Sequence, residues 1–316
     1  MDLLRDLTAG LIDYAGLFPP AGLTMRSAVR NYATYRRSPQ AWMLGRFIVP
    51  ASRLSEFIDE ASALPADSGG TPWRLSVLLP AEGDEHVETL RRFNAQHGLH
   101  GGGRWSAEAV EIGAAEPGAI SEWVRRLERE LILFFEVPLP EEGNEDDEGV
   151  LLARLEVIRD TGTFAKIRTG GVTAGAIPGA RAIARFLGHA ALGDVAFKAT
   201  AGLHHAIRGD HALTYAPGAP VATMHGLLNV VVAAVLARER AADTDNEAVE
   251  KTIETILEER EPGAFGLDDH RLTWRDVAFD RDRVAAARAR FVLGVGSCSF
   301  EEPIADLRAL GLLATV

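Results

Sequence analysis

Two of the three lysines in the chain lie in segments that resemble each other. Lys166 stands in the apolar run 164–171 and Lys198 in the run 195–202, and each run ends in glycine. Side chains alternate along a strand, so Lys166 shares a face with Arg168. If both runs are strands of one barrel and these faces point inward, the two amines become near neighbours.

Two neighbouring ammonium groups disfavour each other's charge. We therefore expect Lys198 to lower the pKa of Lys166, so that Lys166 can attack a carbonyl as a neutral amine and form a Schiff base. All other basic residues except Lys251 are arginines, which cannot do this chemistry. The alternative is that both lysines pair with carboxylates such as Glu136 or Glu111 and only fill the interior.

Three carboxylates also lie on apolar runs, namely Asp13, Glu111 and Glu136. A Schiff-base enzyme needs a proton shuttle, and a buried carboxyl group with a raised pKa suits that role. We expect Glu111 or Asp13 to shuttle protons beside Lys166 and Lys198. Glu136 is expected to contact the substrate.

Histidines offer a competing site. His204 and His205 are adjacent, and a mononuclear metal centre joined by Asp13 or Glu136 is one alternative. The spacing matches no specific ligand pattern, so we predict no metal and no cofactor, and we expect His204 to contact the substrate. Cys298, the single cysteine, has no partner histidine that the sequence identifies.

A turn rich in glycine and serine precedes the last expected helix. Backbone N–H groups of such a turn can hold an anion. Glu301 and Glu302 follow at once and would repel a phosphate, which favours a substrate without one. The expected substrate-binding residues are Glu136, Arg168, Thr169, Thr200, His204, Gly296, Ser297 and Ser299.

Short apolar runs alternate with amphipathic stretches along the chain. The runs predict eight strands, at residues 11–16, 45–50, 75–80, 109–115, 131–139, 164–171, 195–202 and 291–300. Helical periodicity is found between most of them, and several strands are apolar on both faces, as in a parallel sheet covered by helices. We predict an α/β fold, a TIM (β/α)8 barrel formed by residues 1–316 as one domain. An open doubly wound sheet is the alternative.

The alternation breaks once, between the seventh and eighth strands. Residues 203–290 are more than a plain crossover needs and contain two helical stretches. We interpret them as a helical insertion within the barrel. It would act as a lid over the site or as a contact between copies of a homo-oligomer.

Composition limits the classes of partner that we expect for the chain. The chain has 316 residues and a net charge of −12, with no local basic patch, so we expect neither nucleic acid nor a membrane as a partner. Its longest apolar run, residues 227–237, is about half the roughly 20 residues that cross a bilayer. A single cysteine and no secretory signal fit the cytoplasm. The expected partner is a small-molecule carbonyl substrate.

Taken in order, several motifs resemble those of the deoxyribose-phosphate aldolase family. The resemblance is carried by residues 11–14 with 17–20, 45–50, 133–136, 164–171, 195–202 and 296–299. The fourth of these segments is similar to the family's segment that bears the Schiff-base lysine, and the last is similar to its phosphate loop.

This resemblance implies a class I aldolase on a TIM barrel, with a role in carbohydrate metabolism. Lys166 would be the nucleophile, Lys198 the second lysine, and Glu111 would stand where the family has its catalytic aspartate. We therefore expect a Schiff-base-forming carbon–carbon lyase that acts on a small carbonyl compound. The alternatives are a metal-dependent lyase or hydrolase using His204 and His205, and a barrel that binds a metabolite without turning it over.

Overall fold

Eight parallel strands form a closed barrel in the computed structural model, which describes residues 3–65, 71–82, 85–98, 103–127, 131–140 and 145–314. The order around the barrel is β1-β13-β7-β6-β5-β4-β3-β2. The strands are β1 Ile12–Tyr14, β2 Leu44–Pro50, β3 Trp73–Leu79, β4 Trp105–Ile112, β5 Ile132–Glu136, β6 Phe164–Arg168, β7 Phe197–Thr200 and β13 Val292–Ser297. The predicted TIM barrel is confirmed, and the doubly wound alternative is wrong.

The barrel strands are apolar on both faces because helices cover their outer side. Phe134 and Phe135 are neighbours on β5 and point to opposite faces, and each is at most 1% exposed. Paired strand segments are shorter than the apolar runs that predicted them. The last run, for example, leaves the barrel after Ser297, where α11 is about to begin.

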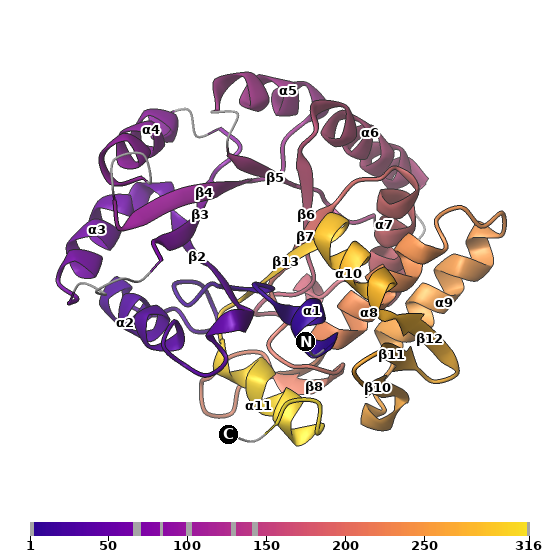
Figure 1. Ribbon diagram of the computed structural model, residues 1–316. Helices are drawn as coiled ribbons and strands as arrows, with labels where there is room; N and C mark the ends of the chain where they lie inside the picture. The colour runs from indigo at the N-terminus through magenta and orange to yellow at the C-terminus, as the bar shows by residue number, and fades with distance from the viewer. Residues whose placement is uncertain are drawn as a thin grey trace.

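A ring of helices surrounds the barrel, as Figure 1 shows. The helices are α1 Leu3–Thr8, α2 Met25–Tyr35, α3 Leu54–Ser62, α4 Glu85–His97, α5 Pro117–Arg126, α6 Glu145–Thr161, α7 Ala180–Leu192, α8 Leu227–Glu239, α9 Asn246–Glu258, α10 Arg281–Arg290 and α11 Glu301–Ala309. Short 3-10 turns are found at η1 Ala41–Met43, η2 Ala51–Arg53, η4 Ala174–Ala176 and η5 Pro262–Ala264. No helix of the described residues is long and apolar enough to cross a membrane.

Helix α8 is apolar around its whole circumference, and residues 227–237 are all buried. It contacts α7, α9, α10 and β13, so none of its faces meets solvent. This environment explains why the longest apolar run of the sequence shows no helical amphipathicity.

The segment between β7 and β13 contains short strands as well as helices. An antiparallel hairpin, β8 Gly209–Ala212 with β9 Val221–Met224, follows β7. A three-stranded antiparallel sheet, β10 Phe265–Leu267, β11 Arg271–Trp274 and β12 Val277–Asp280, follows α9. Figure 1 shows this sheet at the outside of the ring, beside α8 and α10.

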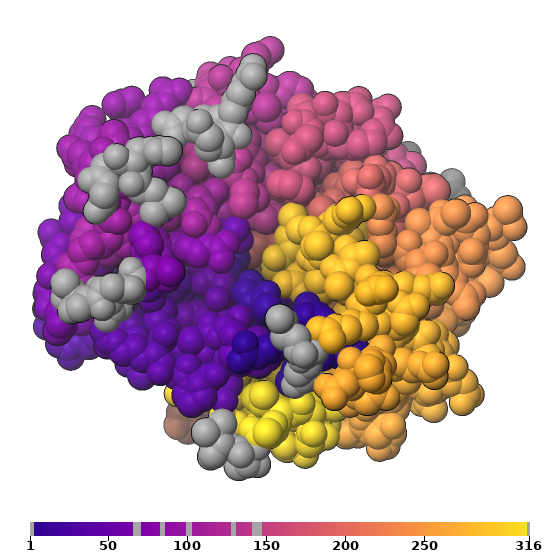
Figure 2. All heavy atoms as spheres, in the orientation of Figure 1, coloured from indigo at the N-terminus to yellow at the C-terminus, as the bar shows by residue number. Residues whose placement is uncertain are grey.

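The amino end of the barrel is covered by the N-terminal helix. Arg288 of α10 donates hydrogen bonds to the carbonyls of Leu7 and Ala9, which tie α1 and the start of β1 to the last crossover. With all heavy atoms drawn, side chains fill the middle of the ring (Figure 2). TIM barrels place their active sites at the carboxyl end of the strands.

Candidate active site

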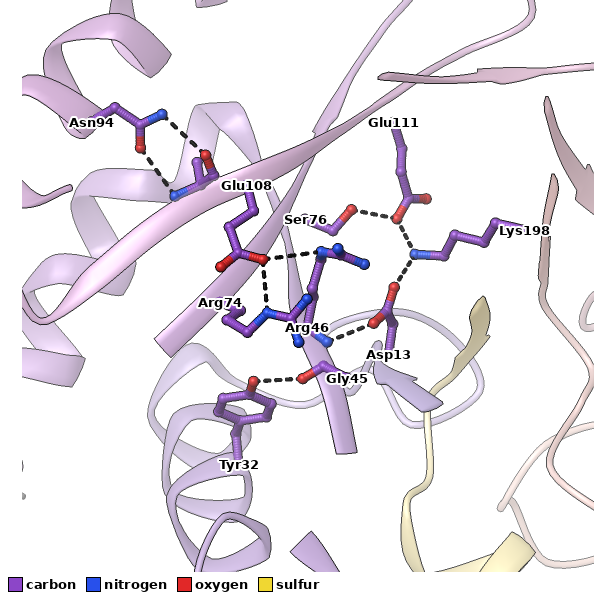
Figure 3. A network of polar contacts seen from close by, with 11 residues as sticks. Asp13, Tyr32, Gly45, Arg46, Arg74, Ser76, Asn94, Glu108, Glu111 and Lys198 are labelled. Carbon is purple, nitrogen blue, oxygen red and sulfur yellow. Dashed lines mark hydrogen bonds and ion pairs between the residues drawn. The ribbon is translucent and has the colours of Figure 1, made fainter. Parts of the chain in front are cut away.

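The two interior lysines stand side by side on neighbouring strands. Lys166 of β6 and Lys198 of β7 are direct partners in the strand register, and both are buried. The Nζ atom of Lys198 lies 2.5 Å from Oδ2 of Asp13 and 2.5 Å from Oε1 of Glu111, as Figure 3 shows. The Nζ atom of Lys166 lies 2.9 Å from Oε2 of Glu136 and 3.7 Å from Oε2 of Glu111.

Glu111 is the carboxylate that both lysines share. The hydroxyl of Ser76 also donates to its Oε1, at 2.7 Å. Burial by itself would raise the pKa of Glu111, but the charges of Lys198 and Lys166, with the hydrogen bonds from Lys198 and Ser76, lower it to about 2. Glu111 is therefore ionised at neutral pH and cannot serve as the protonated shuttle that the sequence suggested.

Lys198 is held in its charged form. Burial would lower its pKa, but the facing charges and hydrogen bonds of Asp13 and Glu111 outweigh burial and raise the pKa above its ordinary value. The carboxylate of Glu111 faces the amines of both lysines, at 2.5 Å from Lys198 and 3.7 Å from Lys166. The geometry matches the alternative interpretation, in which both lysines pair with carboxylates.

Further charged residues continue this network toward the amino end. The backbone N–H of Arg46 donates to Asp13, and the guanidinium groups of Arg46 and Arg74 both face Glu108, at 3.6 Å and 2.7 Å (Figure 3). The buried guanidinium of Arg46 is thus compensated by the charge of Glu108, although its Nε atom has no hydrogen-bond partner among the described residues.

A cavity of about 280 Å³ opens at the carboxyl end of the barrel. Lys166, Arg168 and Thr200 line it from β6 and β7, and Gly296 lines it from β13. Phe18, Pro19, Pro20 and Val172 form an apolar wall. The volume is slightly below the roughly 300–1,000 Å³ of drug-sized ligand sites, so the cavity suits a small metabolite.

Arg168 differs from the other cations around the cavity. Its side chain is exposed at the mouth, and within the described residues it has no carboxylate partner. The neighbouring threonines are engaged in structure: Thr200 donates to the carbonyl of Ile167, and Thr169 donates to the carbonyl of Ala201. These two hydroxyl groups fasten the carboxyl ends of β6 and β7 to each other.

His204 and Cys298 contact each other in the wall of the cavity. The Nδ1 atom of His204 lies 3.4 Å from Sγ of Cys298 and 3.3 Å from Oγ of Ser297. Burial, together with the charges of His205 and His211, lowers the pKa of His204 to about 4, so its imidazole is neutral at physiological pH. The sequence could not identify this contact, because His204 follows β7 whereas Cys298 follows β13.

The thiol of Cys298 is in the protonated form. Burial raises its pKa to about 11, and the neighbouring carboxylate of Glu302 acts in the same direction. A thiolate is required for nucleophilic attack, so this environment does not favour Cys298 as a nucleophile.

His205 points to different partners. Its Nδ1 atom lies 3.0 Å from Oδ2 of Asp306, and its ring stacks on that of His211 with 3.4 Å between the ring centroids. Among the residues that the structure describes, no group of three or more His, Cys, Asp or Glu side chains is arranged to hold a metal ion. The alternative of a metal centre built on His204 and His205 is therefore not supported by the geometry.

The Gly/Ser turn is held by hydrogen bonds among its own residues and to the start of α11. The hydroxyl of Ser297 donates to the carbonyl of Ser299, and the hydroxyl of Ser299 accepts the backbone N–H of Glu302 at the start of α11. Gly296 and Cys298 of this turn line the cavity, whereas Ser297 and Ser299 do not. Gly296 packs closely on β7, since a Cβ atom there would lie 3.1 Å from Cγ2 of Thr200.

Comparisons with known proteins give little likeness. No family model matches the chain, and no curated protein matches it. Among solved structures, it is similar to the crystal structure of the Bacillus megaterium QM B1551 spore cortex-lytic enzyme SleL, with a TM-score of 0.38 and 10% sequence identity, covering 96% of this chain and 73% of that one. No activity is transferred at this level of similarity.

The resemblance to the deoxyribose-phosphate aldolase family is therefore wrong. Neither a family model nor a curated protein supports it. The expected activity of a Schiff-base-forming carbon–carbon lyase is wrong as well. The physical reason lies in the lysines, since Asp13 and Glu111 hold Lys198 as an ammonium and Glu136 pairs with Lys166.

Proposed function

We propose that the chain is an enzyme that binds a small organic anion at the carboxyl end of the barrel and moves a proton on a carbon next to a carbonyl group. The observation that carries the proposal is Arg168, an exposed cation at the mouth of the cavity without a carboxylate partner among the described residues. A guanidinium group matches a carboxylate in a two-pronged hydrogen bond.

Charge balance supports an anionic substrate. Inside the barrel, Lys198 is compensated by Asp13 and Glu111, and Lys166 is compensated by Glu136. Arg168 is left as the cation that a ligand can neutralise. In a cavity with a partly apolar wall, such an unbalanced charge attracts a small anion more strongly than it would in open water.

Two other groups supply acid–base chemistry. The neutral imidazole of His204 can accept a proton from the carbon beside the substrate carbonyl, and the electron pair of that C–H bond then moves onto the carbonyl oxygen. The ammonium group of Lys166, held in place by Glu136, stabilises the enolate oxygen that forms. Return of the proton to carbon completes an isomerisation or epimerisation, with no oxidant or reductant consumed.

The partners follow from this proposal. It requires a small-molecule substrate and neither nucleic acid nor membrane, and the single cysteine continues to favour the cytoplasm. A homo-oligomer formed through residues 203–290 stays a prediction.

The test is solvent exchange observed by NMR. The protein is incubated in D2O with a panel of small 2-oxo and hydroxy-oxo acids, and loss of the C–H signal next to the carbonyl is followed. Arg168→Met should raise KM about ten-fold or more, the loss expected for one charge-assisted contact. Arg125→Met, which removes an exposed arginine of α5, is the matched control and should leave KM unchanged. Equal effects of the two variants would overturn the role of Arg168.

A further inference from the structure

The two halves of the cavity at the carboxyl end of the barrel differ in chemistry. Among the described residues that line it, the charged and hydroxyl-bearing ones come from β4, β6 and β7, namely Glu111, Lys166, Arg168 and Thr200. The residues from β2, β3 and the loop after β1 are all apolar, namely Ala15, Phe18, Pro19, Pro20, Ile48 and Leu78. In the closed barrel β2 is four strands from β6 and β3 is four strands from β7, so the apolar half faces the polar half across the barrel (Figure 1).

Ile48 and Leu78 point into the barrel. Residues two apart on a strand share a face, and Leu78 is two residues from Ser76, whose hydroxyl donates to the interior carboxylate of Glu111. A Cβ atom at Gly296 of β13 would lie 3.5 Å from Cδ1 of Ile48, so the tip of this side chain also lies inside the barrel. Both side chains line the cavity at the carboxyl ends of their strands, where a ligand can contact them.

The loop after β1 presents few polar groups to the cavity. Pro19 and Pro20 have no backbone N–H. The N–H of Ala15 donates to the carbonyl of Ser297, and the N–H of Phe18 donates to the carbonyl of Ala15. A ligand oxygen buried against these four cavity-lining residues would lose its water without gaining an N–H partner from them, which disfavours a hydroxyl group at this place.

The polar half suits the other end of a ligand. Arg168 is the exposed cation of the mouth, and Lys166 lies deeper, with an ammonium group that Glu136 holds. Gly296 keeps the two halves joined, since a Cβ atom there would contact both Thr200 and Ile48. A ligand with a carboxylate at one end and an apolar chain at the other therefore matches the cavity.

We propose that the substrate is a short 2-oxo acid whose chain beyond the carbonyl group is apolar, and that Ile48 and Leu78 select this chain against hydroxylated ones. The assignment rests on the proposed function, in which Arg168 binds the carboxylate and Lys166 faces the carbonyl oxygen. The rest of the chain crosses the barrel and packs on Ile48 and Leu78. A hydroxyl group on that chain would be buried against apolar side chains.

Two compounds that differ by one hydroxyl group test the proposal, namely 2-oxopentanoate and 4-hydroxy-2-oxopentanoate. Exchange of the protons next to the carbonyl in D2O gives kcat/KM for each. The wild type should prefer 2-oxopentanoate about ten-fold or more, and Ile48→Thr and Leu78→Thr should each lower this ratio about five-fold or more. Leu152→Thr, at an exposed position of α6, is the control and should keep the wild-type ratio. A ratio within one variant does not depend on how much of the protein is folded.

Calorimetric titration of the full chain with the same two compounds in H2O separates this proposal from the proposed function, because binding needs no turnover. Tighter binding of 2-oxopentanoate, with a lower ratio in Ile48→Thr, would support the ligand class even if neither compound exchanged, and the proposed function alone would then be overturned. Exchange at equal kcat/KM for the two compounds, or a wild-type ratio in both Ile48→Thr and Leu78→Thr, would overturn the ligand class and leave the proposed function standing. Absence of both binding and exchange would overturn both.

Discussion

The Oε1 atom of Glu111 lies 2.5 Å from the Nζ atom of Lys198, and both side chains are buried in the barrel. The other oxygen of this carboxylate faces Lys166, at 3.7 Å. One carboxylate thereby compensates two ammonium groups on neighbouring strands. The interior of the barrel is an array of paired charges, which can orient and stabilise a substrate at the carboxyl end, and Lys198 within it is held as an ammonium group.

Replacing Lys198 by methionine should strongly destabilise the protein. The change leaves Asp13 and Glu111 buried without their shared cation, which costs roughly 3–5 kcal/mol of unfolding free energy. Lys251→Met is the matched control, because Lys251 is exposed on α9 and pairs with Glu254 at the surface. It should change stability by no more than about 0.5 kcal/mol. Urea denaturation at neutral pH measures both, and equal losses would contradict the account.

The depressed pKa of Glu111 predicts a loss of stability in acid. A carboxyl group whose pKa falls from 4.5 unfolded to about 2 folded stabilises the folded state above pH 4.5, and this contribution disappears as the pH falls toward 2. The contribution is roughly 3 kcal/mol. Urea denaturation at a series of pH values should show a flatter acid decline in Glu111→Gln than in the wild type. Parallel declines would rule out this role.

His204 should stay neutral well below the usual range of histidine. Because burial lowers its pKa from 6.5 to about 4, its contribution to stability is present above pH 6.5 and is lost as the pH falls to 4. An NMR titration of the imidazole C–H signals, with His204→Asn used to assign the resonance, gives the midpoint directly. We expect a midpoint near 4, and a midpoint near 6.5 would contradict the buried, neutral imidazole.

Gly202 should not tolerate a side chain. Its φ of 77° lies in the left-handed region, and an added Cβ would come within 3.0 Å of the Cα atom of Gly170. Gly202→Ala should therefore lower the unfolding free energy by roughly 1–3 kcal/mol. Gly175→Ala, at a position with open space and an ordinary φ, is the control and should be nearly neutral. Thermal unfolding of the two variants makes the comparison, and similar melting temperatures would refute it.

The barrel could be predicted from sequence because its strands are short, apolar on both faces and separated by helical stretches. The partners of the lysines could not be predicted from the sequence. Lys198 and Asp13 are 185 positions apart, and nothing local in either segment encodes their contact. The contact between His204 and Cys298 spans 94 positions and could not be predicted for the same reason.

The aldolase resemblance failed for a related reason. Short glycine, serine and threonine motifs at strand ends are degenerate, and one barrel fold hosts many unrelated functions. Similarity of turns therefore carried information about the fold and none about the chemistry. The small strands of residues 203–290 are only three or four residues long, too short for their alternation to stand out.

The most direct test of the proposed function is solvent exchange by a variant at His204. In D2O with a substrate that the wild type exchanges, His204→Asn should lower the exchange rate by about 10²–10⁴-fold, the usual effect of removing a general base. His270→Asn, which changes an exposed histidine on a distant turn, should exchange like the wild type. Exchange at the wild-type rate in His204→Asn, or no exchange by the wild type with any member of the panel, would contradict the account.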